Sequence, residues 1–207
     1  MCNFFSAIIT KDDIIYDPQT DMHEDLIKKA RLDDTTLRPD FVRVEINPID
    51  RDIFNHDMNN WQFKIDQDLL PVWWTKDFLR IAKERTKQAL QDVFGKIIFI
   101  NVKNAVITNQ RAFLKNSSVE AWGNSSVVAR DNSSVEARGN SSVEAWDNSS
   151  VVAWGNSSVV IPFSKTINIK SVQDNAVVKD LSGDKPKLIV SDINRFDIVK
   201  FDEGASR

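Results

Sequence analysis

Hydrophobic and polar residues alternate with a period of two through a run of six near-identical octapeptides, residues 116 to 163. The units read NSSVEAWG, NSSVVARD, NSSVEARG, NSSVEAWD, NSSVVAWG and NSSVVIPF. Eight is not a multiple of the helical period, and helical repeats need about 30 residues or more per unit. The pattern therefore predicts one strand and one corner per octapeptide, with the strands stacked in parallel as a β-solenoid.

The alternation also assigns each repeat position to a face of its strand. Val at position four and Ala at position six are predicted to point inward, and positions five and seven to point to solvent. Gly or Asp at position eight, followed by Asn, is typical of a corner with left-handed backbone, and the repeated Asn predicts an amide ladder between rungs. The outward position seven carries large side chains, namely Trp122, Arg130, Arg138, Trp146 and Trp154.

The solenoid is predicted to extend beyond its recognisable repeat. Residues 164–171, SKTINIKS, continue the phase with Ile167 and Ile169 in the inward positions, and KIIFINVKNAVI from Lys96 forms the opening strands. NAVVKD and KLIVSD read as closing strands joined by the turn SGDKP, and RFDIVKF, residues 195–201, as a cap. Two coil sizes fit the repeat. Two octapeptides per coil suit the small Val and Ala side chains, whereas three per coil would align the most similar units.

The first 95 residues contain no repeat and predict a separate α+β domain, 1–95, followed by the solenoid domain, 96–207. NFFSAIIT and FVRVEINP have the composition of strands. Asp21 to Glu24 has the spacing of a capping box ahead of a short helix. Apolar residues between Thr75 and Phe94 recur on one stripe, which predicts a long helix that ends at Gly95.

Composition narrows the classes of partner. The hydrophobic content is 42%, and the formal net charge of −3 comes from 27 basic and 30 acidic residues mixed along the chain. Without a long basic tract, nucleic acid is not an expected partner. The chain has neither an apolar stretch of about 18 residues nor a secretory leader, so we expect no membrane span and a cytoplasmic location. A single cysteine excludes an internal disulfide.

Few residues suggest catalysis or a metal site. Cys2 would become the N-terminal residue if Met1 is removed, and its own α-amine could then activate the thiol. The start Met-Cys-Asn resembles the Met-Cys-Gly start of class II glutamine amidotransferases, which would imply a Cys2 nucleophile, but the family's later motifs have no counterparts here. His23 and His56 lie next to carboxylates without the spacing of a metal motif, so we predict neither a metal nor a cofactor.

The octapeptide array, residues 116 to about 171, resembles that of β-helix repeat proteins from phage and mobile elements. The resemblance implies the solenoid architecture and such an origin, with the cytoplasm of a host as the location. The sequence thus favours a non-enzymatic binding protein that presents the position-seven side chains to a protein partner, such as a host complex that it inhibits, or to a second copy of itself. The alternative is an enzyme that uses Cys2.

Overall fold

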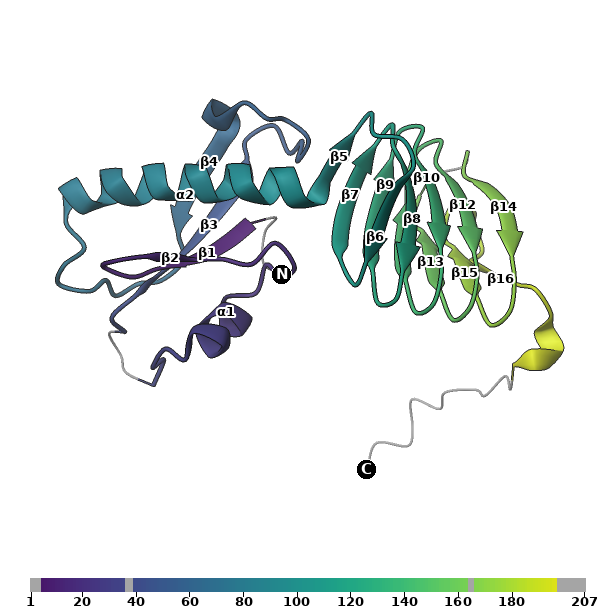
Figure 1. Cartoon of the computed structure of the whole chain (residues 1–207), viewed down its shortest axis with the longest axis horizontal. Coiled ribbons are helices and arrows are strands. Elements are labelled where there is room, and N and C mark those ends of the chain that lie inside the picture. The colour runs from purple at the N-terminus through teal and green to yellow at the C-terminus, as the bar shows by residue number, and fades with distance from the viewer. Residues whose placement is uncertain (1–4, 36–38, 164–165, 197–207) are drawn as a thin grey trace. The chain divides into compact units, whose positions relative to one another are not determined.

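The structure is a computed structural model, and it describes residues 5–35, 39–163 and 166–196. The chain divides into two compact units, residues 1–98 and 99–207, and the division falls close to the predicted boundary after residue 95. The first unit has mixed α and β structure and the second is a parallel β-solenoid (Figure 1). The predicted fold class is confirmed.

The N-terminal unit is a four-stranded antiparallel sheet in the order β2-β1-β3-β4, with α1 and α2 packed on it. Val42, Val44 and Ile46 of β3 are buried on one face, where Trp61 and Phe63 of β4 lie beside them. Ile8 of β1 packs on the other face against α1. The elements are β1 (Phe5–Ile9), β2 (Ile14–Ile15), α1 (His23–Ala30), β3 (Val42–Pro48), the 3-10 turn η1 (Met58–Asn60), β4 (Trp61–Ile65) and α2 (Lys76–Ile97).

Two predicted helix boundaries in this unit are wrong. The N-cap of α1 is Met22, which makes no side-chain capping bond, so the expected Asp21–Glu24 capping box does not form. Helix α2 begins as expected, with the Thr75 hydroxyl accepting a hydrogen bond from the Phe78 N–H, but it continues through Gly95 to Ile97. Gly95 does not end the helix because its backbone stays right-handed and Ile97 is still buried in the core.

A small polar cluster ties α2 to the chain after β2. The Tyr16 hydroxyl donates a hydrogen bond of 2.9 Å to the carboxylate of Asp92, and the Lys96 ammonium donates one to the same carboxylate at 2.6 Å. These two donors lower the pKa of Asp92, with Lys96 contributing most. Burial, followed by the hydrogen bond to Asp92, raises the pKa of Tyr16.

The octapeptide array has 16 residues per coil, because Ser118 of one rung is paired with Ser134 of the next. From β5 to β15, successive strands alternate between a five-stranded sheet, β14-β12-β10-β8-β6, and a seven-stranded sheet, β16-β15-β13-β11-β9-β7-β5 (Figure 1). The strands are β5 (Ile98–Ile100), β6 (Ala105–Thr108), β7 (Arg111–Lys115), β8 (Ser118–Trp122), β9 (Ser126–Arg130), β10 (Ser134–Ala137), β11 (Ser142–Ala145), β12 (Ser150–Ala153), β13 (Ser158–Ile161), β14 (Asn168–Val172), β15 (Val177–Asp180) and β16 (Lys187–Val190), followed by the turn η2 (Ile193–Arg195).

The core between the two sheets consists of the predicted Val and Ala positions. All ten of these side chains in the first five octapeptides are at most 3% exposed. The repeated Asn side chains form the predicted ladder, in which Asn140 Nδ2 donates to Asn124 Oδ1 and Asn156 Nδ2 donates to Asn140 Oδ1, both at 3.3 Å. Two small side chains per strand therefore fill a narrow two-sheet core, which is the packing argument for the 16-residue coil.

The serine at position two has a structural role that the sequence did not suggest. It is buried in all six octapeptides. In Ser125, Ser133 and Ser141 the hydroxyl donates 2.6–2.7 Å bonds to the position-seven carbonyl three residues earlier. At Trp122 and Arg138 the same carbonyl also accepts a backbone N–H, so the serine hydroxyl adds a second hydrogen bond that holds the corner.

The last coil keeps the predicted inward residues and adds one. Ile167 and Ile169 both pack against the solenoid core, and a register shift between β12 and β14 then places Val172 opposite Ala153, so that it packs on the core as well. The predicted closing strands form a hairpin in which β16 pairs antiparallel with β15 and ends the seven-stranded sheet. Most of the predicted RFDIVKF cap lies outside the described residues.

Candidate interaction surface

The position-seven side chains of alternate octapeptides form two columns, one for each sheet. Trp122, Arg138 and Trp154 follow one another at the ends of β8, β10 and β12, and we call them column A. Arg130 and Trp146 follow β9 and β11 and form column B. Because consecutive strands cross the solenoid in opposite directions, the two columns lie on different sheets and at opposite edges. One flat partner surface therefore meets only one column.

Column A is held together by stacking between rungs. The Arg138 guanidinium carbon lies 4.8 Å from the centre of the Trp122 ring and 4.7 Å from the centre of the Trp154 ring. A guanidinium within about 6 Å of an aromatic face is attracted by the negative potential of that face. Arg138 therefore occupies one face of each tryptophan, and the indole rings present mainly their edges and outer faces to solvent.

In three octapeptides a glutamate at position five contacts the position-seven side chain of the same strand. The Trp122 indole N–H donates to Glu120 at 3.3 Å, and the Trp146 indole N–H donates to Glu144 at 2.9 Å. Arg138 makes a salt bridge with Glu136 in the same way. Where position five is Val152, the buried Trp154 indole N–H has no acceptor among the described residues. Position five thus orients the position-seven side chain two residues later, on the same face of the strand.

The prediction that the position-seven side chains point outward is confirmed, but they are less exposed than expected. Trp122 is 40% exposed and Arg130 is also exposed. Arg138, Trp146 and Trp154 have only intermediate exposure. The difference arises because each side chain is covered by the one from the next rung, an interaction that strand alternation alone does not describe.

Column B is shorter and has an exposed aromatic residue at its end. Arg130 lies 5.2 Å from the centre of the Trp146 ring, and the Phe163 ring lies 6.0 Å from Trp146 on the other side. Phe163 is 77% exposed. Column A has its own apolar neighbour, because Val106 of β6 is 63% exposed next to Glu120. Each column therefore combines a guanidinium with indole, two rings in column A and one in column B, and has a strongly exposed apolar side chain beside it.

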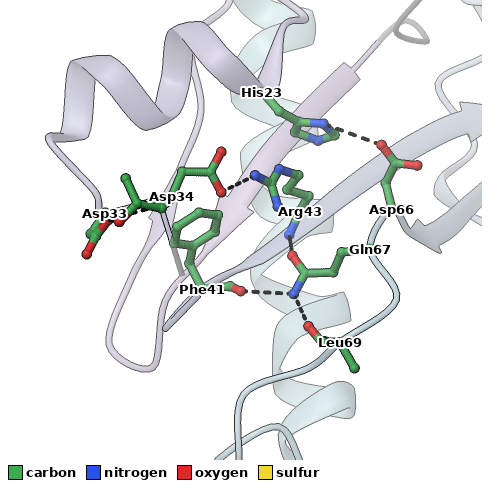
Figure 2. Close-up of polar contacts among 9 residues, drawn as sticks. His23, Asp33, Asp34, Phe41, Arg43, Asp66, Gln67 and Leu69 are labelled. Carbon is green, nitrogen blue, oxygen red and sulfur yellow. Dashed lines mark hydrogen bonds and ion pairs between the residues drawn. The ribbon is translucent and has the colours of Figure 1, made fainter. Parts of the chain in front are cut away.

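A second group of polar residues lies on the α1 face of the N-terminal sheet (Figure 2). The buried His23 has its Nε2 3.0 Å from the Val44 carbonyl oxygen and its Nδ1 3.6 Å from Asp66. Each ring nitrogen faces an acceptor of the protein and the imidazole itself is buried, so His23 is not arranged as a base for an external substrate.

The charges around His23 are also paired. Arg43 makes a salt bridge with Asp34, and the Gln67 side chain accepts from the Arg43 backbone N–H and donates to the carbonyls of Phe41 and Leu69 (Figure 2). This arrangement fixes the loop that follows β4 and stabilises the sheet. His56 lies elsewhere, stacked at 4.9 Å on Phe94, so the two histidines do not share a site.

The described part of the chain contains no group of three or more His, Cys, Asp or Glu side chains arranged to hold a metal ion. Cys2 lies outside the described residues, so the nucleophile that the amidotransferase resemblance implies stays a prediction. Within the described ranges, no helix combines the length and the apolar character needed to cross a membrane. Comparisons of the chain with protein-family models, curated proteins and solved structures found no match.

Proposed function

We propose that this protein is a non-enzymatic binding protein, of phage or mobile-element origin, whose solenoid presents column A to a protein partner in the cytoplasm of a host cell. The observation that carries the proposal is the stacked arrangement of Trp122, Arg138 and Trp154 on the outside of a rigid sheet. Trp and Arg are the side chains most enriched at the energetic centres of protein interfaces.

Pre-organisation supports this use of the column. A free Arg side chain loses much rotamer freedom when a partner immobilises it, which lowers affinity. In column A, Arg138 is already fixed by two rings and by Glu136. A partner that contacts this surface therefore gains the apolar area of the rings at a reduced entropic cost. The adjacent Val106 extends the apolar surface along the same sheet.

The proposal is tested by capture from the native host, with the wild-type chain compared with two matched variants. Trp122→Ser combined with Trp154→Ser removes the rings of column A. The control, Ile49→Ser combined with Val72→Ser, removes exposed apolar side chains from the N-terminal unit, where these residues are 64% and 86% exposed. Quantitative mass spectrometry of the captured proteins should show one or more partners lost with the column variant and retained with the control.

Folding of the column variant is checked first by circular dichroism. Loss of the two contacts to Arg138 should lower the stability by about 1–2 kcal/mol, from about 0.5–1 kcal/mol for each cation–π contact, which leaves the solenoid folded. If a folded column variant captures the same partners as the wild type, column A is not the binding surface. Sedimentation measurements separate the alternative of self-association, since a second copy would appear as a concentration-dependent dimer that the column variant lacks.

The enzymatic alternative is separated by Cys2→Ala. A binding protein that uses column A retains its partners in this variant, because Cys2 belongs to the other unit. Loss of the biological effect in Cys2→Ala with retained capture would instead favour the nucleophile that the Met-Cys start implies.

A further inference from the structure

A groove in the N-terminal unit lies between helix α2 and strand β4, and it is separate from both columns. Its volume is about 460 Å³. Apolar side chains form much of its wall, with lysines on the helix side. The lining residues are Ile46, Met58, Asn59, Trp61, Gln62, Phe63, Lys83, Thr86, Lys87 and Leu90.

The groove exists because α2 does not cover the whole sheet. The helix packs on β1 and β2, whereas β4 is at the opposite edge of the order β2-β1-β3-β4. At the start of β4, Trp61 is buried against Phe94 of α2, with the ring centres 5.0 Å apart, but Phe63 and Ile65 farther along the strand have intermediate exposure. Lys83 reaches from the helix toward this edge, with its ammonium 6.0 Å from the centre of the Phe63 ring.

The outer edge of β4 offers backbone hydrogen-bonding groups next to the groove. Asp66 N–H donates to the Arg43 carbonyl and Ile49 N–H donates to the Asn60 carbonyl, which fixes the alternation of the antiparallel ladder. By that alternation Gln62 and Lys64 bond to β3, and the backbone groups of Phe63 and Ile65 point away from it. No other described strand pairs with this edge, so it can accept an additional strand.

The charge beside the groove specifies the kind of strand. Four exposed basic residues follow one stripe of α2 at spacings of three and four, namely Lys76, Arg80, Lys83 and Lys87. None of the described residues that line the groove is acidic. Two acids lie beside the groove. The Glu84 carboxylate is 3.9 Å from Lys87 in an exposed pair that neutralises it only weakly, and the Asp57 carboxylate accepts the backbone N–H of the lining residue Asn59. A basic stripe of this kind stands out in a unit where acids outnumber bases.

We propose that this groove binds an extended, acidic segment of another protein, which adds to the β4 edge as a fifth strand. The backbone of the segment pairs with Phe63 and Ile65, its alternate apolar side chains enter the groove between β4 and α2, and its carboxylates contact Lys83 and Lys87. A free edge strand beside a helix favours an extended peptide over nucleic acid, which would need open aromatic faces for its bases. Of the two aromatic rings in the groove, Trp61 is buried against Phe94, and Lys83 lies over Phe63. The proposal does not depend on column A.

The test uses the full chain and a short fluorescent peptide in which Asp and Glu alternate with Val and Phe. The peptide should bind in fluorescence anisotropy. A peptide with Lys in place of every acid should bind at least about tenfold more weakly. Lys83→Glu combined with Lys87→Glu should weaken binding of the acidic peptide by about tenfold or more. The matched control, Lys103→Glu combined with Lys170→Glu, makes the same charge change at exposed positions of the solenoid and should leave the affinity unchanged.

Amide hydrogen exchange measured by NMR identifies the mode of binding without any variant. Saturating peptide should slow exchange at Phe63 and Ile65 by tenfold or more, while Gln62 and Lys64, which already pair with β3, should change little. The proposal is overturned if the acidic peptide does not bind, if it binds without protecting Phe63 and Ile65, or if a single-stranded oligonucleotide binds there instead. If exchange at Phe63 and Ile65 slows as the protein concentration rises in the absence of peptide, the β4 edge pairs with a second copy of the chain instead.

Discussion

The same substitution, Gly to Ala, should have opposite effects at two places in this chain. Gly139 occupies a corner of the solenoid with φ at +64°, and a Cβ added there would lie 3.2 Å from the backbone N and 3.3 Å from the backbone O of Gly123 in the preceding rung. Gly95 lies inside α2, and an added Cβ would have no atom within 4 Å. The two positions therefore separate the cost of the corner from the general effect of removing a glycine.

The magnitudes follow from these geometries. A left-handed backbone costs an L-residue about 1–2 kcal/mol, and forcing a methyl group against backbone that cannot move costs roughly 1–3 kcal/mol more. Gly139→Ala should thus lower the stability of the solenoid by about 2–5 kcal/mol, a large part of the 5–15 kcal/mol typical of a domain. Gly95→Ala should raise the stability of α2 by up to about 1 kcal/mol, because alanine is the better helix former.

Hydrogen-exchange mass spectrometry measures the effect of each substitution separately in the solenoid and in the N-terminal unit, and thermal melts provide a second measure. Gly139→Ala should speed exchange throughout residues 116–163 and leave residues 76–97 unchanged, and Gly95→Ala should slow exchange in 76–97 only. A solenoid of unchanged stability in Gly139→Ala would refute the close stacking of the glycine corners. Similar destabilisation by both substitutions would show that the loss of a glycine, rather than its corner, is responsible.

Three further outcomes test the face assignment, the coil and a surface charge. Val135→Asp should unfold the solenoid by burying an unpaired carboxylate, whereas Val128→Asp at an outward position should lower the melting temperature only slightly. Equal melting temperatures for the two variants would show that the assignment of inward and outward faces is wrong. Deletion of residues 132–147 should leave a folded, shorter protein with one coil fewer. Deletion of residues 132–139 should move every later strand to the other sheet. An intact melting transition after this second deletion would contradict the 16-residue coil. The pKa of Asp92 is lower in the folded protein than in the unfolded chain. Its contribution to stability is therefore present above the unfolded pKa and is lost as the pH falls through the folded pKa. Asp92→Asn should thus reduce the loss of stability in acid, which is measured by thermal melts between about pH 2 and pH 6.

The sequence by itself determined the class of the fold and the faces of the repeated strands. Val135 and Ala137 are inward and Trp122 is outward because strand alternation has a period of two and the octapeptide is even, so each copy repeats the same assignment. The left-handed corners at Gly139 and Asp131 were likewise predictable, since few residue types tolerate that backbone.

The tertiary structure alone decided which octapeptides meet. Near-identical repeats give a 16-residue and a 24-residue coil the same local pattern, and only the volume between the sheets selects between them. That selection places Arg138, rather than Trp146, against Trp122 and so creates column A. Helix α2 likewise continues past Gly95 because the burial of Ile97 outweighs a weak local preference to stop. Contacts between residues distant in sequence depend on the packing of the whole coil, and no local pattern contains them.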